Sequence, residues 1–250
     1  MTPPITKTPP AFRLASPETG TTYPIYVAAP GPAGSEARTA LLLMDGDYFF
    51  DPAVEAAQEL GMQGAIAPVL IVGVGYGAGF GAKANRRGRD YTPTASALEP
   101  DSGGGDAFLP FLATTLWPEL ARRYPVRDDR RAIGGHSLGS LLVLHAIFQP
   151  EAFFQLGLAS APSIWWDDRA ILGSVARLRE TKSALAARLF LGVGTDDSAS
   201  MTGDLALLEQ QLAARPFDGL QIVSERYPGR DHYDVVPDSL RGGMRALFAK

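Results

Sequence analysis

The alternation of apolar runs with helix-like segments constrains the fold of this chain more than any other sequence feature. Runs that are almost continuously apolar, typical of strands buried on both faces, occupy residues 40–44, 65–74, 155–160 and 188–194, and shorter strand-like runs occupy 131–135 and 220–227. Helix-like segments lie between and after them, near residues 53–60, 106–124, 140–148, 171–187, 203–214 and 237–248. Strands that alternate with helices predict an α/β fold with a mostly parallel central sheet and helices on both of its faces.

The N-terminal part of the chain departs from this alternation. Four of the first ten residues are proline, so we expect residues 1–11 to form a disordered arm and residues 12–250 to form a single domain. Two short strand-like runs between residues 12 and 30 flank a turn at residues 17–20, which predicts an antiparallel hairpin at one edge of the sheet. Residues 75–100 are rich in Gly, Arg and polar residues and predict a long, functional loop.

The charge balance and the residue inventory exclude several classes of function. The net charge of −4 gives no basic surface for nucleic acid, so we expect no nucleic-acid partner. Without any cysteine, the chain has no thiolate nucleophile, disulfide or zinc–thiolate site. Asp45 and Asp47 lack a histidine cluster beside them, so we expect no metal. Apolar runs stay well short of a membrane span, and the first residues do not resemble a signal peptide, which favours a cytoplasmic protein without a membrane partner.

A sequence motif typical of a serine nucleophile lies at a predicted strand-to-helix junction. Residues 135–139 read Gly-His-Ser-Leu-Gly and match G-x-S-x-G, between a short strand and an apolar helix. Glycines two residues either side of Ser137 permit a tight turn that exposes its hydroxyl above the sheet. We predict that Ser137 is a nucleophile; the alternative is a glycine-rich turn with a capping serine.

A serine hydroxyl needs a base, and the chain has three histidines. His136 adjoins the serine and His145 lies on the apolar helix that follows, so both are expected to be structural. His232 lies on a loop between the last strand and the last helix, at the end of the chain order Ser–acid–His that accompanies a G-x-S-x-G turn, and we predict that it accepts the proton of Ser137. The alternative is an ordinary loop histidine.

A carboxylate should orient the base, and further donors should stabilise the charge of the transition state. Asp197 is the slight favourite for the acid and Asp196 is nearly equal, because both follow a buried strand; Asp231 is too close to the base in sequence to pair well. One oxyanion-hole N–H is expected from Leu138. The second is expected near Gly46 and Asp47, after the first buried strand.

Taken together, these segments resemble the putative esterase family that includes esterase D and the ferric-enterobactin and bacillibactin trilactone hydrolases. The resemblance runs from residue 12 to the C-terminus and is carried by the segments 16–20, 43–49, 89–93, 130–139, 160–166 and 229–232. It implies an α/β-hydrolase fold and a serine esterase that uses no metal or organic cofactor. It also implies a small-molecule ester substrate, with siderophore trilactones as candidates. Some members of the family act with a Ser–His dyad, so the resemblance does not require Asp196 or Asp197 for catalysis.

The resemblance also suggests residues that border the substrate. Arg89, Tyr91, Trp165 and Trp166 are expected to bind it, and the arginines at 86, 87 and 89 favour an anionic group. The alternatives are a solvated arginine run and tryptophans that fill the core. Acyl transfer to an alcohol and a non-catalytic binding module remain the competing functions. The oligomeric state is not predicted.

Overall fold

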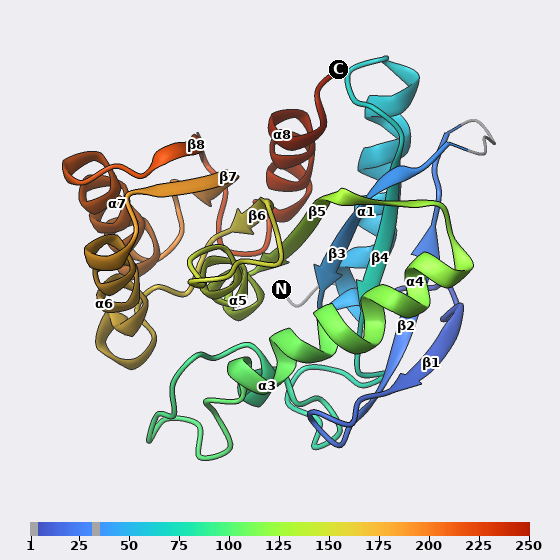
Figure 1. Ribbon diagram of the computed structural model, residues 1–250, viewed down its shortest axis with the longest axis horizontal. Helices are drawn as coiled ribbons and strands as arrows, with labels where there is room; N and C mark the ends of the chain where they lie inside the picture. Colours follow the sequence, from blue (N-terminus) through green and yellow to red (C-terminus); the bar gives the residue numbers. More distant parts are fainter. Residues whose placement is uncertain (1–4, 32–35) are drawn as a thin grey trace.

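A computed structural model describes residues 5–31 and 36–250, and a mixed β-sheet forms its centre (Figure 1). Its strands are β1 (Phe12–Ala15), β2 (Thr22–Ala28), β3 (Arg38–Met44), β4 (Val69–Val74), β5 (Val126–His136), β6 (Leu156–Ser160), β7 (Ala184–Gly194) and β8 (Asp218–Tyr227). Their order across the sheet is β1-β2-β4-β3-β5-β6-β7-β8. The pairs β1–β2 and β2–β4 are antiparallel and all other neighbours are parallel. The predicted mostly parallel sheet with an antiparallel N-terminal hairpin is confirmed.

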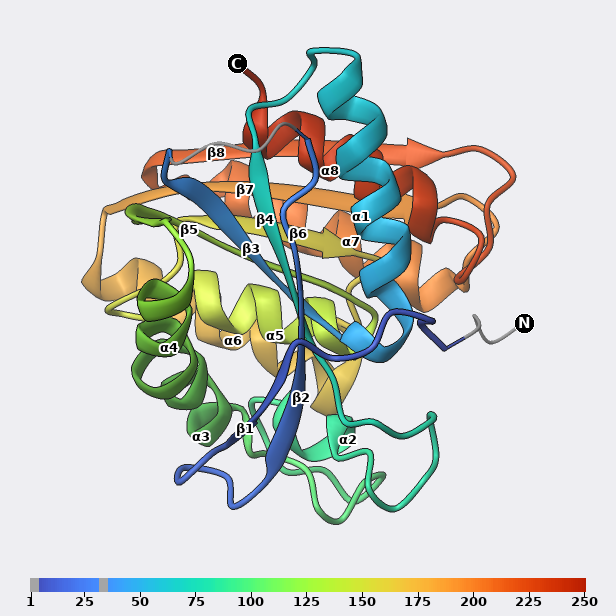
Figure 2. The same ribbon diagram turned by 90° about the vertical axis from the view of Figure 1, so that its right-hand side faces the viewer.

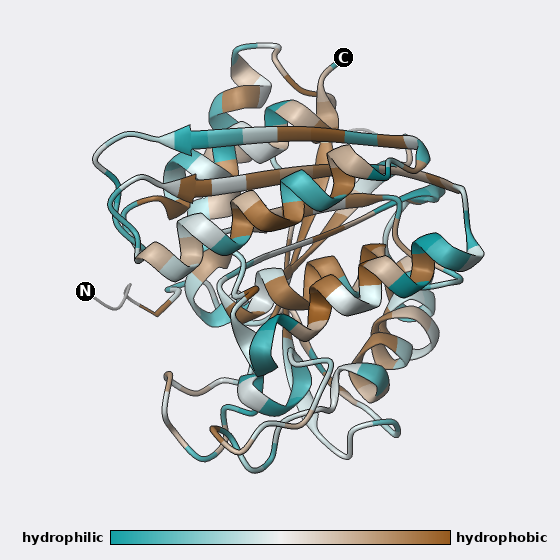
Figure 3. Ribbon diagram, turned by 90° about the vertical axis from the view of Figure 1, so that its left-hand side faces the viewer, coloured by the Kyte–Doolittle hydropathy of each residue, from teal (hydrophilic) through white to brown (hydrophobic). Residues whose placement is uncertain are grey.

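Helices cover both faces of this sheet, as predicted (Figure 2). They are α1 (Gly46–Met62), α2 (Arg87–Asp90), α3 (Gly105–Pro110), the π-helical segment η1 (Phe111–Leu116), α4 (Trp117–Arg123), α5 (Leu138–Ile147), α6 (Trp166–Thr181), α7 (Ala199–Ala214) and α8 (Val236–Phe248). In β3, Leu41 and Leu43 pack in the cluster with α1 and α8, whereas Leu42 and Met44 pack in the cluster with α3 to α7. Successive side chains point to opposite faces, which is why the run is apolar at every position. Figure 3 shows these apolar strands between the helices.

Several boundaries differ from those predicted. The helix expected at residues 106–124, which Pro118 is predicted to disturb or divide, consists of α3, η1 and α4; Pro118 lies in the first turn of α4, where its missing N–H is tolerated. The helix expected at residues 171–187 ends at Thr181, because residues 184–187 already alternate between exposed and buried positions as the start of β7. Helix α1 begins at Gly46 and contains Pro52.

Part of the expected disordered arm is hydrogen-bonded to α1. The backbone N–H of Thr6 donates to the carbonyl of Asp47 at 2.6 Å, and the N–H of Lys7 and hydroxyl of Thr8 donate to Asp51 at 2.7 and 2.6 Å. A carboxylate in the first turns of α1 thus accepts hydrogen bonds from residues 7 and 8, a long-range contact that local composition does not predict. Residues 1–4 lie outside the described part of the chain.

The parallel strands place their carboxyl ends at one edge of the sheet. The loops that follow β3, β5, β6, β7 and β8 therefore meet there, which is where ligands bind in open α/β sheets. Within residues 5–31 and 36–250, no helix has both the length and the apolar character needed to cross a bilayer.

Candidate active site

Ser137 occupies a strained turn between β5 and α5. Its φ of 59° and ψ of −120° are unfavourable for a residue with a side chain, and such strain is concentrated at functional sites. A side chain at Gly135 would overlap the backbone of Gly139, so glycine is required there for the turn to close. This geometry aims the Ser137 hydroxyl out of the sheet edge and starts α5 directly beside it.

His232 and Asp197 complete a chain of hydrogen bonds from Ser137. His232 Nε2 lies 3.1 Å from Ser137 Oγ, and His232 Nδ1 lies 2.8 Å from Asp197 Oδ2. The Asp197 side chain is 3% exposed and the His232 side chain 27%, so the imidazole faces solvent while the carboxylate does not. Because the carboxylate can only accept, Nδ1 carries the ring proton and Nε2 is left to accept the proton of Ser137. The structure therefore brings together Ser137, His232 and the favoured Asp197.

The Asp196 and Asp231 side chains instead form hydrogen bonds with neighbouring residues of their own loops. The Asp196 side chain accepts a hydrogen bond from the Thr195 hydroxyl at 3.1 Å and is exposed. Asp231 accepts the backbone N–H groups of Tyr233 and Asp234, both at 2.8 Å, and these hydrogen bonds lower its pKa. Asp231 thus fixes the turn that presents His232 without contacting the ring nitrogens.

Backbone hydrogen bonds join the loop of the acid to the loop of the base. The N–H of Thr195 donates to the carbonyl of Tyr227 at 3.0 Å, and the N–H of Asp196 donates to the carbonyl of Arg230 at 3.0 Å. Gly194 packs so closely that a Cβ there would overlap the Arg230 carbonyl. Asp197 and His232 are therefore held by one connected piece of backbone.

His136 is fully buried against the base, which agrees with the structural role expected for it. Its ring centroid lies 4.6 Å from that of His232, and its Nδ1 lies 3.1 Å from Ser160 Oγ. Its Nε2 has no hydrogen-bond partner among the described residues. Burial, followed by the proximity of His232 and Arg87, lowers the pKa of His136 well below its usual range, so it is a neutral neighbour for His232.

This depressed pKa predicts a pH dependence of stability. In the unfolded chain His136 takes up a proton near its ordinary pKa of about 6.5, whereas in the folded protein it stays neutral. Stability is therefore expected to fall as the pH drops below about 6.5, by up to about 1.4 kcal/mol per pH unit for one proton. In urea unfolding between pH 7.5 and 5, His136→Asn should lessen this slope. An unchanged slope would contradict a neutral buried His136.

The expected oxyanion-hole residues lie at two neighbouring helix starts. Leu138 is the first residue of α5, and Gly46 and Asp47 are the first two of α1, so their N–H groups have no carbonyl one turn earlier to bond. A Cβ on Gly139 would lie 3.1 Å from the Met44 side chain, which places the two helix starts side by side. The Asp45 N–H already donates to the Tyr91 hydroxyl at 2.9 Å. This leaves Gly46 and Asp47 as the candidates for the second donor.

A buried ion pair between Asp45 and Arg87 holds the turn that precedes α1. Asp45 has a left-handed backbone (φ 53°, ψ 45°), and its carboxylate accepts two hydrogen bonds from Arg87, at 3.0 and 2.9 Å. The Asp45 side chain is fully buried, which raises its pKa, and the Arg87 guanidinium opposes that rise. The neighbouring Asp47 carboxylate accepts from the Tyr26 hydroxyl at 2.7 Å and from the N–H groups of Tyr76 and Gly77. Both aspartates are thus structural carboxylates.

Removal of the Arg87 guanidinium is expected to destabilise the folded protein. Arg87→Met leaves the Asp45 carboxylate buried without its partner, and we expect the free energy of unfolding to fall by about 3–5 kcal/mol. The matched control is the double variant Asp45→Asn, Arg87→Met, which removes the unpaired charge and should recover part of the loss. Urea unfolding measures both; an Arg87→Met variant as stable as the parent protein would refute this account.

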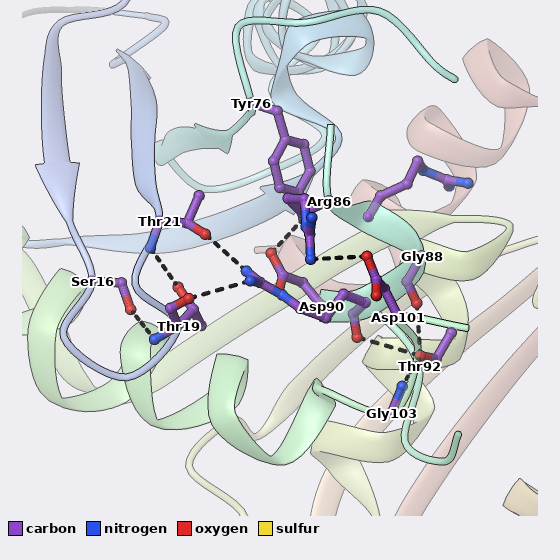
Figure 4. A network of polar contacts seen from close by, with 12 residues as sticks. Ser16, Thr19, Thr21, Tyr76, Arg86, Gly88, Asp90, Thr92, Asp101 and Gly103 are labelled. Atoms are coloured by element: carbon purple, nitrogen blue, oxygen red, sulfur yellow. Dashed lines mark hydrogen bonds and ion pairs between the residues drawn. The ribbon is translucent and has the colours of Figure 1, made fainter. Parts of the chain in front are cut away.

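Arg89 and Tyr91 differ in their access to a substrate. Arg89 donates to the adjacent Asp90 at 2.6 Å, to the Thr21 hydroxyl at 2.8 Å and to the Thr19 carbonyl at 3.2 Å. Figure 4 labels these three partners. Tyr91 is fully buried beneath the Asp45 turn. Arg89 anchors α2 to the β1–β2 hairpin and also lines the cleft that adjoins Leu138, so its contact with a substrate stays a prediction. Tyr91 has no exposed surface and supports the Asp45 turn instead of contacting a substrate.

Asp90 is the centre of that network. Its buried carboxylate accepts from the Tyr23 hydroxyl at 2.7 Å and the Tyr76 hydroxyl at 3.0 Å, as well as from Arg89. The pKa of Tyr23 is raised by its burial and by the Asp90 charge. Segments 16–20 and 89–93, which were noticed separately in the sequence, are therefore partners in one loop-to-hairpin junction.

The arginine run does not form a free cationic patch. Arg86 pairs with Asp101 at 3.2 Å, Arg87 with Asp45 and Arg89 with Asp90. Two of these charges are matched by fully buried carboxylates, yet all three arginines line the cleft beside Leu138, so their attraction for an anionic substrate stays a prediction. Arg86 and Asp101 remain partly exposed, with side chains 32% and 68% accessible.

The two adjacent tryptophans differ in exposure. Trp166 is 3% exposed and donates its indole N–H to the Thr94 carbonyl at 3.1 Å, whereas Trp165 is 37% exposed. Trp166 thus fills the core and ties the segment after β6 to the long loop. Trp165 is the one of the pair available to a substrate.

A cleft of about 470 Å³ adjoins the start of α5. It is lined by Leu138 on one side and by residues of the long loop, including Phe80, Lys83, Arg86 and Glu99, on the other. The predicted functional loop therefore borders a cavity that reaches the Ser137 turn. Among the residues that the structure describes, no group of three His, Cys, Asp or Glu side chains is arranged to hold a metal ion.

Ser163 and Ser140 were not identified from the sequence. Ser163 Oγ lies 3.2 Å from Ser137 Oγ, and Ser140 Oγ donates to the carbonyls of Gly135 and Ser160 at 2.6 and 2.7 Å. The Ser160-Ala-Pro-Ser163 segment contributed to the family resemblance, but nothing local indicates that its second serine meets the nucleophile.

A family model and the similar curated proteins all point to esterases. Residues 16–232 match the model of the Esterase family, described as "Putative esterase". Ferri-bacillibactin esterase BesA of Bacillus subtilis is 28% identical over 243 residues, which cover 90% of this chain and 84% of that protein. Siderophore triacetylfusarinine C esterase of Aspergillus fumigatus is 37% identical over 145 residues, 57% of this chain, and the match spans half of that protein's length.

Solved structures agree with the fold. The BES protein from Bacillus cereus superposes with a TM-score of 0.85 at 27% identity, covering 98% of this chain and 97% of the other. Siderophore hydrolase EstB from Aspergillus nidulans superposes with a TM-score of 0.83 at 24% identity over 100% and 98% of the two chains. At 24% identity, the likeness to EstB shows that the two proteins share a fold and nothing more. The predicted α/β-hydrolase fold is confirmed.

Proposed function

This chain belongs to the Putative esterase family, and on that premise we propose that it hydrolyses carboxylic esters through an acyl-enzyme on Ser137. The single observation that carries the proposal is the uninterrupted chain of hydrogen bonds from Ser137 through His232 to Asp197. A partly buried hydroxyl, an unprotonated ring nitrogen and a buried carboxylate in this order are the components that nucleophilic acyl transfer needs.

In the first half of the reaction, Ser137 Oγ attacks the ester carbonyl carbon while His232 Nε2 accepts the hydroxyl proton. The carbonyl oxygen becomes an oxyanion, for which Leu138 N–H and an N–H of Gly46 or Asp47 are the proposed donors. Asp197 stabilises the imidazolium. The carbon–oxygen bond to the alcohol then breaks, the alcohol leaves with the proton from His232, and the acyl group stays on Ser137.

In the second half, water attacks the acyl carbon while His232 accepts one of its protons. The bond to Ser137 Oγ breaks, His232 returns the proton to that oxygen, and the carboxylic acid leaves. The relatives that hydrolyse bacillibactin and triacetylfusarinine C esters suggest siderophore esters as the substrate class. The cleft beside Leu138 offers apolar and polar side chains to such a molecule. The exposed Trp165 stays a predicted substrate contact.

The test combines active-site labelling with a substrate comparison. We expect a fluorophosphonate to attach to the purified protein once, with the modified peptide carrying Ser137 by mass spectrometry. Hydrolysis of p-nitrophenyl butyrate should be compared with that of a trilactone siderophore, with and without bound iron, at equal enzyme concentration. Labelling at another residue would refute the nucleophile, and preference for the simple ester over both siderophores would refute the substrate class.

A further inference from the structure

We propose that Ser163 is a positioning residue that holds the Ser137 hydroxyl in its reactive orientation; the inference rests on the function proposed for Ser137. Ser163 is fully buried in the segment that follows β6. Its hydroxyl lies 3.2 Å from Ser137 Oγ, and its backbone N–H donates to the Ser137 carbonyl at 3.3 Å. Two atoms of one buried residue thus contact both the side chain and the backbone of the proposed nucleophile.

The direction of the hydroxyl bond follows from counting protons. Ser137 has one hydroxyl proton, and His232 Nε2 can accept it because the ring proton is on Nδ1, beside Asp197. Ser163 must then be the donor in its bond to Ser137. The reverse direction would turn the Ser137 proton away from its base. It would also leave the buried Ser163 proton without an acceptor in the part of the chain that the structure describes, which is costly.

This arrangement affects the step in which Ser137 attacks. A serine side chain has three staggered rotamers, and contacts with both His232 and Ser163 select one of them. As the proton leaves, negative charge grows on Ser137 Oγ, and a donor already directed at that atom stabilises it. Without the Ser163 hydroxyl, Ser137 should spend less time in the reactive orientation and should attack more slowly.

The test measures acylation alone in Ser163→Ala. The second-order rate constant for fluorophosphonate labelling is expected to fall about tenfold, the change that one such hydrogen bond supports. kcat for ester hydrolysis should fall with it while KM stays unchanged, and the pH at which the labelling rate is half-maximal should not move, because the base is the same. A variant disturbed only in its packing would change KM or the melting temperature instead.

The matched control is Ser239→Ala in α8. Ser239 is also fully buried, but its hydroxyl has no partner among the described residues and it lies outside the proposed site. Its loss should leave labelling at the parental rate. If Ser163→Ala lowers the melting temperature by more than about 5 °C, Ser163→Cys replaces it in the test, since a thiol fills the space that alanine leaves empty but donates weakly. Its labelling should also be slow.

The outcomes separate this inference from the function on which it rests. If the unmodified protein is not labelled at Ser137, the proposed function itself fails. If Ser137 is labelled and a stably folded Ser163→Ala or Ser163→Cys variant reacts at the parental rate, the nucleophile stands and the role of Ser163 is overturned.

Discussion

Replacement of Ser137 by alanine is expected to lower kcat for ester hydrolysis by roughly 10⁴- to 10⁶-fold and to abolish fluorophosphonate labelling. The hydroxyl is the only atom removed, so substrate can still enter the cleft beside Leu138, but no acyl-enzyme can form. Residual turnover should reflect water attack helped by the oxyanion donors. Initial rates on p-nitrophenyl butyrate, with labelling followed on gels, provide the measurement.

The control for this variant is its stability. Alanine at position 137 adopts the same positive φ as serine with no added bulk, so the melting temperature should stay within a few degrees of the parent. A folded Ser137→Ala protein that retained more than about 1% of the parental activity would show that another group performs the attack.

Asp197→Asn is expected to lower kcat by roughly 10⁴-fold, the effect of the corresponding change in a serine protease triad. An amide can donate an N–H to His232 Nδ1, which would favour the ring tautomer with its proton on Nε2, facing Ser137. That tautomer cannot accept the hydroxyl proton. The measurement is kcat across a pH series, so that a change in the titration of the base is distinguished from a loss of rate.

Asp196→Asn is the matched control. It makes the same chemical change one residue away, on a side chain that is exposed and contacts Thr195 instead of the imidazole, and kcat should change less than threefold. If Asp197→Asn also cost less than about tenfold, the protein would work as a Ser137–His232 dyad. That outcome would reduce Asp197 to a structural partner of the imidazole.

The parts of the site that could be predicted from sequence are those carried by chain order and periodicity. Apolar runs predicted which strands are buried, and the position of Ser137 and His232 relative to those strands predicted that they would meet. The sequence favours Asp197 over Asp196 only slightly, because both lie in the loop that follows β7. Their separation depends on the turn after Gly194, where the Asp197 N–H bonds to the Gly194 carbonyl at 3.3 Å and directs the side chain inward.

The side-chain contacts of three of the predicted substrate-binding residues could not be predicted. Arg89, Tyr91 and Trp166 have polar or aromatic neighbours in sequence, a context that fits a ligand-binding surface as well as it fits contacts within the protein. Their actual partners are distant in sequence: Thr19 and Thr21 for Arg89, Asp45 for Tyr91 and Thr94 for Trp166. A single sequence contains no local signal for such pairs. The same holds for Ser163, which meets Ser137 only because β5 and β6 are neighbours in the sheet.

The joined backbone of the acid and base loops has a consequence for mutational scanning. Since the peptide groups after β7 are bonded to those after β8, a displacement of either loop is transmitted to the other. Gly194 has no side chain and touches no reacting group, yet a bulkier residue there would push against Arg230 and shift the imidazole and its carboxylate together. Loss-of-function positions in this protein should therefore include glycines that a map of polar side chains would omit, and their inactivation should resemble that of Asp197 variants.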